Sequence, residues 1–313
     1  MDVATAAETA VRCRGLVKRY ADVTAVAGLD LEIRRGECFG LLGPNGAGKT
    51  TTIEILEGLT SPDAGEVELL GTTWDREPQR LRERIGISLQ ETQLNEKLTV
   101  EETLRLFRSF YAHGRDPDLV IADLSLEEKR RARVGKLSGG QKQRLAVACA
   151  LVGDPEVLFL DEPTTGLDPQ SRLELWGLVT RFRAEGGTVL LTTHYMDEAE
   201  RLCDRVAIVD HGKVIALGTP AELVGSLRAA NVIEFAAEPE LPEAELLALP
   251  GATELHRRGP HQALSVGVLS DAVPALLAAI DGAGAKLVNL STHRATLEDL
   301  FVSLTGRELR EGQ

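Results

Sequence analysis

A run of eight residues from Gly43 to Thr50 constrains this sequence more than any other segment. It reads Gly-Pro-Asn-Gly-Ala-Gly-Lys-Thr, which fits the pattern GxxxxGK[ST], and it lies between an apolar run typical of a strand and a helical run. Its glycines allow the backbone to curl so that successive amides point inward, and the helix that follows adds the positive end of its dipole. The segment therefore predicts a loop that binds phosphate groups.

The residue types at the end of this loop indicate a nucleoside triphosphate with a magnesium ion. Lys49 places a full positive charge near the β- and γ-phosphates, and the Thr50 hydroxyl can ligate Mg²⁺. The alternative is a glycine-rich turn that binds nothing. The residues that we predict to bind ATP along this segment are Gly43, Pro44, Asn45, Gly46, Ala47, Gly48, Lys49, Thr50 and Thr51.

A pair of acidic residues, Asp161 and Glu162, follows the apolar run Val157-Leu-Phe-Leu. The run places Asp161 at the end of a buried strand, where a carboxylate is costly unless it serves a cation. We therefore expect Asp161 to help hold Mg²⁺, through water, and Glu162 to orient and polarise an attacking water molecule. The alternative for this pair is a structural role as a cap at the end of the strand.

The region from Val11 to about Pro220 alternates short apolar runs with helical patterns, which predicts an α/β domain. Residues from about 90 to 154 are helical and look like an insertion between strands, with a capping box from Thr99 to Glu102. A β-hairpin is predicted over 206–217. Three runs are brief and continuously apolar, as expected for buried strands of a largely parallel sheet: 38–42, 157–160 and 189–192.

The composition changes after about Val224, where a stretch rich in Ala, Glu and Pro begins. Beyond this stretch we expect strands at 264–269 and 286–290 and helices at 273–280 and 295–304. The predicted domains are therefore 1–224, with a helical subdomain at about 90–154, and 225–313, a small α+β domain in which we recognise no chemistry.

Charge and apolar patterning limit the partners of this chain. The net charge is −13, from 48 acidic and 35 basic residues, and no basic module is present, so we expect no nucleic-acid partner. The longest apolar run has about eight residues against the roughly 18 that a membrane-spanning helix needs, so any membrane role requires a partner. The four cysteines lack metal-ligand spacing and have apolar neighbours, which predicts buried free thiols in a reducing, cytoplasmic compartment.

One further motif, Leu137-Ser138-Gly139-Gly140-Gln141, resembles the signature of ATP-binding cassette (ABC) proteins. The resemblance covers about residues 11–220 and implies a P-loop ABC ATPase domain with a mixed-sheet core and a helical subdomain. The other landmarks of the family appear in the expected order: Tyr20 upstream of the phosphate loop, Gln90 after a strand-like run, Gly166-Leu-Asp168, and His194 after another strand-like run.

The resemblance also implies roles for these residues. Tyr20 would stack on adenine, and His194 would contact the γ-phosphate. Gln90 would contact Mg²⁺ or water while sensing a membrane partner, and Asp168 would contact a facing subunit. The implied catalytic set is Glu162, His194 and Gln90, and the implied metal set is Thr50, Gln90 and Asp161.

The signature segment has a physical interpretation as well. Ser138, Gly139 and Gly140 open a predicted helix, which makes a second helix terminus suited to an anion. In ABC proteins this terminus faces the γ-phosphate that is held by the other subunit. The resemblance therefore implies a nucleotide-dependent homodimer in which Leu137 to Gln141 act in trans.

Two segments are similar to one branch of the family. Thr192–Asp204 is similar to drug exporters of the daunorubicin-resistance type, whose permease is a separate integral membrane polypeptide of the ABC-2 type, and Ala295–Gly306 looks like the ending of such subunits. The implied protein powers export from the cytoplasmic face of the cell membrane. The alternatives are the ATPase of an importer, or a soluble ABC ATPase that acts on nucleic acid or ribosomes. The soluble alternative is disfavoured because Lys49 and Ser138 are 89 residues apart without a long heptad run between them.

Overall fold

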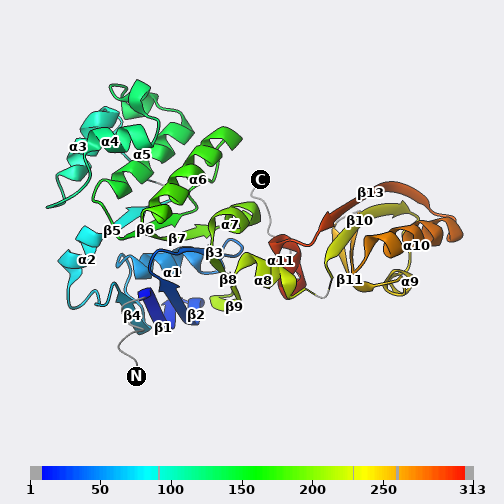
Figure 1. Ribbon diagram of the computed structural model, residues 1–313. Coiled ribbons are helices and arrows are strands. Elements are labelled where there is room, and N and C mark those ends of the chain that lie inside the picture. Colours follow the sequence, from blue (N-terminus) through cyan, green and yellow to red (C-terminus); the bar gives the residue numbers. More distant parts are fainter. Residues whose placement is uncertain (1–8, 91, 228, 259–260, 307–313) are drawn as a thin grey trace. The chain divides into compact units, whose positions relative to one another are not determined.

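The computed structural model of the protein describes residues 9–90, 92–227, 229–258 and 261–306 (Figure 1). The chain forms two compact units, one that ends at Thr219 and one that begins at Pro220. Each unit has its own hydrophobic core. Within the described residues, no helix combines the length and the apolar character that crossing a membrane requires.

A six-stranded sheet forms the centre of the first unit, in the order β5-β6-β7-β3-β8-β9. The first five strands in this order are parallel, and β9 returns antiparallel beside β8. The three runs expected as buried strands are confirmed, and so is the hairpin, in which His211 and Gly212 turn with positive φ. The strands are β3 (Cys38–Leu42), β5 (Ile85–Ser88), β6 (Val157–Asp161), β7 (Thr188–Thr193), β8 (Arg205–Asp210) and β9 (Lys213–Gly218).

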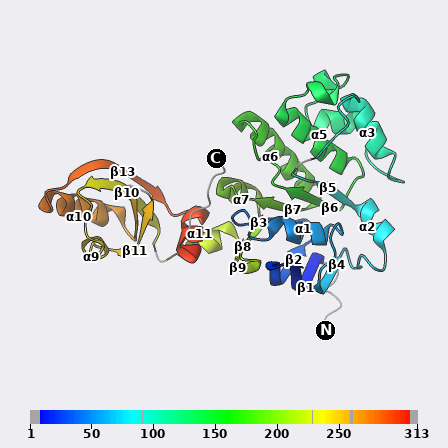
Figure 2. The same ribbon diagram turned by 180° about the vertical axis from the view of Figure 1, so that it is seen from behind.

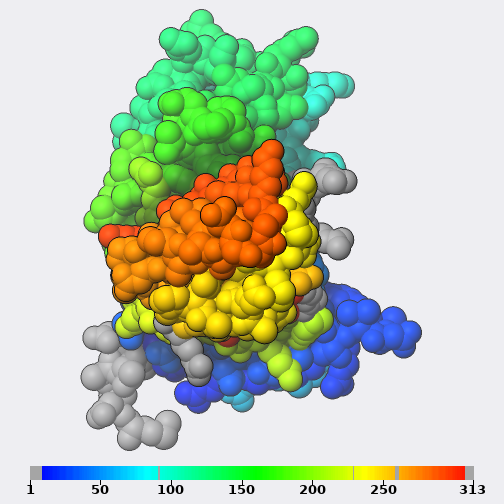
Figure 3. All heavy atoms as spheres, turned by 90° about the vertical axis from the view of Figure 1, so that its right-hand side faces the viewer, coloured from blue at the N-terminus to red at the C-terminus, as the bar shows by residue number. Residues whose placement is uncertain are grey.

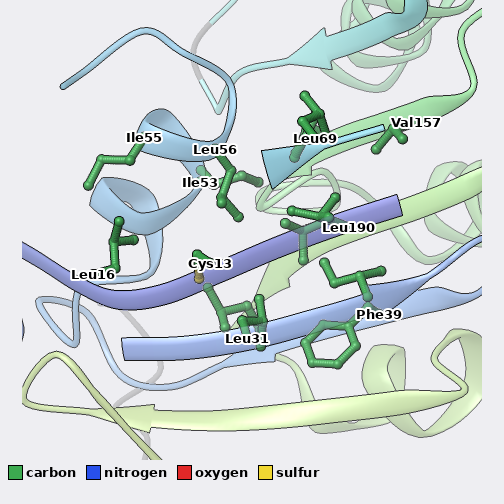
Figure 4. Close-up of a cluster of buried hydrophobic side chains, with 14 of the residues drawn as sticks. Cys13, Leu16, Leu31, Phe39, Ile53, Ile55, Leu56, Leu69, Val157 and Leu190 are labelled. Carbon is green, nitrogen blue, oxygen red and sulfur yellow. The ribbon is translucent and has the colours of Figure 1, made fainter. Parts of the chain in front are cut away.

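A second sheet in the same unit is antiparallel and has the order β2-β1-β4, with β1 at Thr9–Tyr20, β2 at Val23–Arg34 and β4 at Ala64–Leu69. The helix α1 (Lys49–Leu56) lies between the two sheets, and Figure 4 shows its apolar side chains among those of both sheets. Each large apolar side chain buried in this core stabilises the fold by about 1.5–3 kcal/mol. The core therefore fixes the position of the helix that follows the phosphate loop.

Helices cover the opposite face of the six-stranded sheet, as the two views in Figures 1 and 2 show. A Cβ atom at Gly86 of β5 would lie 2.3 Å from the Ala150 carbonyl oxygen, so glycine is required for this close approach of α5. The expected capping box is present, because Thr99 accepts from the Glu102 amide and Glu102 accepts from the Thr99 amide. The helices on this side are α3 (Val100–Arg108), α4 (Pro117–Asp123), α5 (Gly139–Leu151), α6 (Pro169–Ala184) and α7 (Met196–Leu202), whereas α2 (Pro78–Arg84) buries Leu81 in the core that contains α1.

The second unit is an antiparallel sheet with the order β11-β12-β10-β13. Two helices, α9 (Glu243–Leu247) and α10 (Leu269–Gly282), bury one face of it, and Figure 3 looks onto their surface, in yellow and orange. The expected strand at 264–269 was wrong at its end, because β12 stops at Val266 and Leu269 already begins α10. The remaining elements are α8 (Pro220–Gly225), β10 (Asn231–Glu238), β11 (Ala252–Arg258), β12 (His261–Val266), β13 (Lys286–Arg294) and α11 (Leu297–Thr305).

The predicted fold class is confirmed: a mixed α/β unit precedes a small unit with an antiparallel sheet. The predicted cysteine chemistry is confirmed too. All of the cysteines are described, and all are buried free thiols: Cys13, Cys38, Cys149 and Cys203.

Candidate functional site

The phosphate loop joins the end of β3 to the start of α1. A Cβ atom at Gly43 would lie 2.2 Å from the Val209 carbonyl oxygen, and one at Gly48 would lie 2.2 Å from the Ala25 carbonyl oxygen. Both glycines also have positive φ, so both space and backbone conformation demand glycine. The loop consists of Gly43, Pro44, Asn45, Gly46, Ala47 and Gly48, and the first turn of α1 holds Lys49, Thr50 and Thr51.

The first turn of α1 has no capping side chain among the described residues. By contrast, α3, α5 and α6 each begin with a side chain that accepts a hydrogen bond from a backbone amide of the first turn. The amides at the start of α1 can therefore bind an anion, with the helix dipole adding to the attraction. This uncapped terminus fits a phosphate group.

Lys49 is almost fully buried beside the loop. Its Nζ donates to the Gly43 carbonyl at 2.8 Å and to the Pro44 carbonyl at 3.2 Å, and it lies 3.4 Å from Oε1 of Glu162. Burial lowers the pKa of Lys49, and the charge of Glu162 opposes that shift. The ammonium group thus lies between the phosphate loop and a carboxylate.

Glu162 is the residue around which the other predicted catalytic side chains gather. Its Oε2 lies 3.1 Å from Nδ1 of His194 and 3.5 Å from Nε2 of Gln90, and it accepts from the Thr165 hydroxyl at 3.3 Å. The hydrogen bond from His194 and the charge of Lys49 lower the pKa of Glu162 to about 2. The carboxylate is therefore ionised at neutral pH.

The backbone at Glu162 is strained, with φ at +45°. Its amide is held by β7, because it donates to the Thr192 hydroxyl at 2.9 Å and to the Thr192 carbonyl at 3.2 Å. Backbone strain of this kind persists where surrounding contacts over-determine it, and it is concentrated at functional sites. The hydrogen bonds with β7 thus hold the Glu162 backbone in a conformation that directs its carboxylate toward the phosphate loop.

Asp161 is buried at the end of β6 and accepts a hydrogen bond from the Thr192 hydroxyl. Burial raises the pKa of Asp161, while hydrogen bonds from Thr192 and Thr50 oppose that shift. A carboxylate and a hydroxyl at this position are oxygen donors of the kind that Mg²⁺ prefers. The residues present therefore fit a magnesium ion beside the phosphate loop.

The signature segment lies at the start of α5. Ser138 is the N-cap, with its hydroxyl accepting from the Gln141 amide at 3.3 Å and its amide donating to the Gln141 side chain at 3.1 Å. Ser138 and Gly139 are exposed, whereas Leu137 and Gly140 are buried. Among the described residues, Ser138 forms no hydrogen bond or ion pair with Lys49 or Glu162, so the two halves are not brought together within one chain.

Asp168 caps α6 and packs beside the signature segment. Its carboxylate accepts from the Ser171 amide at 3.0 Å and from the Ser171 hydroxyl at 2.7 Å, and these bonds lower the pKa of Asp168. A Cβ atom at Gly140 would lie 2.3 Å from that same hydroxyl. The first turn of α6 and the start of α5 are therefore in direct contact.

Tyr20 lies at the end of β1 and is 46% exposed. Its ring centroid is 5.5 Å from Nζ of Lys18. Its exposed face is available to a flat ligand.

Sequence reasoning missed two residues of the site, Thr165, whose hydroxyl donates to Glu162, and Thr192. Thr192 forms a register pair with Asp161 across β6 and β7, and its hydroxyl contacts both members of the acidic pair. A threonine at the end of a neighbouring apolar strand is the signal that was available for Thr192.

The fold and this site define a P-loop ATPase of the ABC type. Residues 26–165 match the family model described as ABC transporter. The chain is 42% identical over 303 residues to the Nod factor export ATP-binding protein I of Ralstonia nicotianae, covering 95% of this chain and 94% of that protein. It is 44% identical over 306 residues to the protein of the same name from Burkholderia orbicola, covering 95% and 97%. The chain therefore belongs to the family of ABC transporter ATP-binding proteins.

A solved structure supports the same assignment. The dimeric structure of MJ0796, a bacterial ABC transporter cassette, superposes with a TM-score of 0.62 at 28% identity, covering 67% of this chain and 98% of that chain. The predicted activity, an ABC ATPase coupled to transport, is confirmed by the family and by these relatives.

Proposed function

We propose that this protein is the ATP-hydrolysing subunit of an exporter, acting as a homodimer on a separate ABC-2-type permease at the cytoplasmic face of the cell membrane. The names of the relatives, which refer to Nod factor export, support the direction of transport. The similarity of Thr192–Asp204 and Ala295–Gly306 to drug exporters supports the daunorubicin-resistance branch. In this proposal the permease recognises the cargo.

The observation that carries the proposal is the position of Glu162, which lies between Lys49 and His194 beside an uncapped helix terminus. Lys49 turns from the carbonyls of the phosphate loop to the phosphates of ATP. With Lys49 turned away, the pKa of Glu162 rises and the carboxylate becomes a better general base for the attacking water. His194 holds Glu162 through Nδ1 and presents the rest of its ring toward the γ-phosphate.

A magnesium ion would complete this site. Thr50, Asp161 and Gln90 would hold the ion, which would neutralise phosphate charge as the terminal phosphoryl group is transferred to water. Gln90 would then sense the membrane partner, a role that its place after β5, at the start of the helical part of the unit, supports.

The second half of each site comes from the partner copy in this proposal. Ser138 and Gly139 are exposed at the start of α5, where the helix terminus can receive an anion from another molecule. The dimeric cassette among the similar structures supports this arrangement. Because ATP would contact both copies and ADP would lack the bridging phosphate, ATP should favour the closed dimer.

Light scattering tests this ATP-dependent dimer directly. In the Glu162→Gln background, ATP should convert monomers to dimers and ADP should not. Ser138→Arg should abolish the ATP-dependent dimer, whereas Ser109→Arg, at another exposed serine, should leave it intact. A dimer that forms equally well with ADP, or that survives Ser138→Arg, would contradict the proposal.

A further inference from the structure

The ring of Tyr195 contacts two charged or polar side chains, His194 and Arg172. Its centroid is 4.1 Å from that of the His194 ring, with 41° between the two planes. On α6, the Arg172 guanidinium carbon lies 4.6 Å from the Tyr195 centroid. Arg172 also approaches Asp197, with 3.4 Å between Nη1 and Oδ2. These contacts join α6 to the segment that carries the histidine.

The His194 ring has few restraints of its own. Among the described residues it makes one hydrogen bond, through Nδ1 to Glu162, and a single bond allows the ring to pivot about it. The tilted contact with the Tyr195 ring opposes that motion, because moving the rings apart would lose aromatic contact. Tyr195 is in turn restrained by the cation–π contact with Arg172 and by its own amide, which donates to the Thr193 hydroxyl at 2.9 Å.

We propose that Tyr195, held by Arg172, is a positioning residue that fixes the His194 ring for ATP hydrolysis. The inference rests on the proposed function of His194. Arg172 is in the first turn of α6, four residues after the cap Asp168, and its amide donates to the Asp168 carbonyl at 3.0 Å. The helix turn that packs on the signature segment therefore also carries the residue that restrains the histidine.

Through this arrangement, the position of the first turn of α6 affects the rate of ATP hydrolysis. A small displacement of Arg172 loosens Tyr195 and lets His194 leave its orientation toward Glu162. Misplacement of a reacting group by about 1 Å can reduce turnover roughly 100-fold. The expected signature is a loss of kcat without a matching loss of ATP affinity.

A double-mutant cycle in the full-length protein tests the proposal. Tyr195→Ala should lower kcat for ATP hydrolysis by roughly 10- to 100-fold with KM changed by less than about twofold. Tyr195→Phe should rescue most of that loss, because it keeps the ring and its quadrupole. In a His194→Ala background, Tyr195→Ala should cause no further loss, since the residue it positions is absent.

A second pair of variants keeps the test decisive if Tyr195→Ala fails to fold. Arg172→Met should lower kcat several-fold and only when His194 is present. Arg201→Met is the matched control, because Arg201 of α7 lies 5.2 Å from the Trp176 ring of α6, a similar cation–π contact that does not involve His194 or Tyr195. We expect that control to retain full turnover.

The outcomes separate the two proposals. If His194→Ala leaves turnover unchanged, the proposed role of His194 is wrong and this inference has no basis. If His194→Ala lowers turnover but Tyr195→Ala and Arg172→Met do not, only the positioning role is wrong. The positioning role would also be wrong if the fold-losses of turnover caused by Tyr195→Ala and His194→Ala multiplied in the double variant.

Discussion

Nζ of Lys49 lies 3.4 Å from Oε1 of Glu162, and both side chains are almost fully buried. Lys49 belongs to the first turn of α1, whereas Glu162 follows β6, so the contact joins the phosphate loop to the strand that carries the acidic pair. Each group shifts the pKa of the other toward its charged form. The loop and the acidic pair therefore act as one electrostatic unit.

Removing the cation from this unit should weaken ATP binding. We expect Lys49→Ala to lower ATP affinity about 10- to 100-fold, because a hydrogen bond to a charged group contributes about 1.5–3 kcal/mol. Titration with a fluorescent ATP analogue measures this change. Lys213→Ala, at an exposed lysine of β9, is the matched control and should bind normally. An affinity equal to that of the unmodified protein would remove Lys49 from the site.

Removing the carboxylate charge should separate binding from chemistry. We expect Glu162→Gln to retain ATP binding while turnover falls by roughly 10²–10⁴, the contribution of a positioned general base. Phosphate release under saturating ATP measures the turnover. Glu185→Gln, at the exposed C-cap of α6, should keep full turnover. Wild-type turnover in Glu162→Gln would assign the base to another residue.

The site residues that belong to a short contiguous motif could be predicted from the sequence. The phosphate loop needs glycine at Gly43 and Gly48 for reasons of space, so its pattern is visible in the sequence. Thr192 was missed because its contact with Asp161 depends on the parallel register of β6 and β7. Register between strands that are 27 residues or more apart in the chain is a tertiary property.

Other parts of the fold could not be predicted for related reasons. The antiparallel strands β1 and β2 pair with four register shifts, which interrupt the alternation that reveals a half-buried strand. In the second unit, β12 stops early because the chain turns at Gly267, whose carbonyl accepts from the Asn231 side chain at 2.8 Å. Both features depend on partners that are distant in sequence.

Glu57 should make the stability of the first unit depend on pH. It lies at the C-cap of α1, and both of its carboxyl oxygens are buried without a hydrogen-bond partner among the residues that the structure describes. Burial raises its pKa from 4.5 to about 8, with the charges of Asp161 and Glu54 adding to the shift. Between these values the folded state keeps a proton that the unfolded state has released. Stability should therefore fall as pH rises, by about 1.4 kcal/mol per pH unit across this window.

The Glu57→Gln variant isolates this effect, because glutamine is neutral at every pH and has nearly the same shape. Relative to the unmodified protein, it should gain stability progressively from pH 5 to pH 8. Urea unfolding followed by tryptophan fluorescence is suitable, since both tryptophans, Trp74 and Trp176, lie in the first unit. Parallel pH profiles for the two proteins would show that Glu57 is already ionised in the folded state at pH 5.

The contact between Gly140 and Ser171 should make these two helix starts intolerant of one extra methyl group. A Cβ atom at Gly140 would lie 2.3 Å from Oγ and 2.8 Å from Cβ of Ser171, whose hydroxyl is already bonded to Asp168, so α5 and α6 would have to separate. We expect Gly140→Ala to destabilise the first unit by about 1–3 kcal/mol and to weaken the ATP-dependent dimer. Gly139→Ala has open space around its Cβ position and is the matched control for urea unfolding. If Gly140→Ala proved as stable as Gly139→Ala, the two helices would have room to move apart without cost.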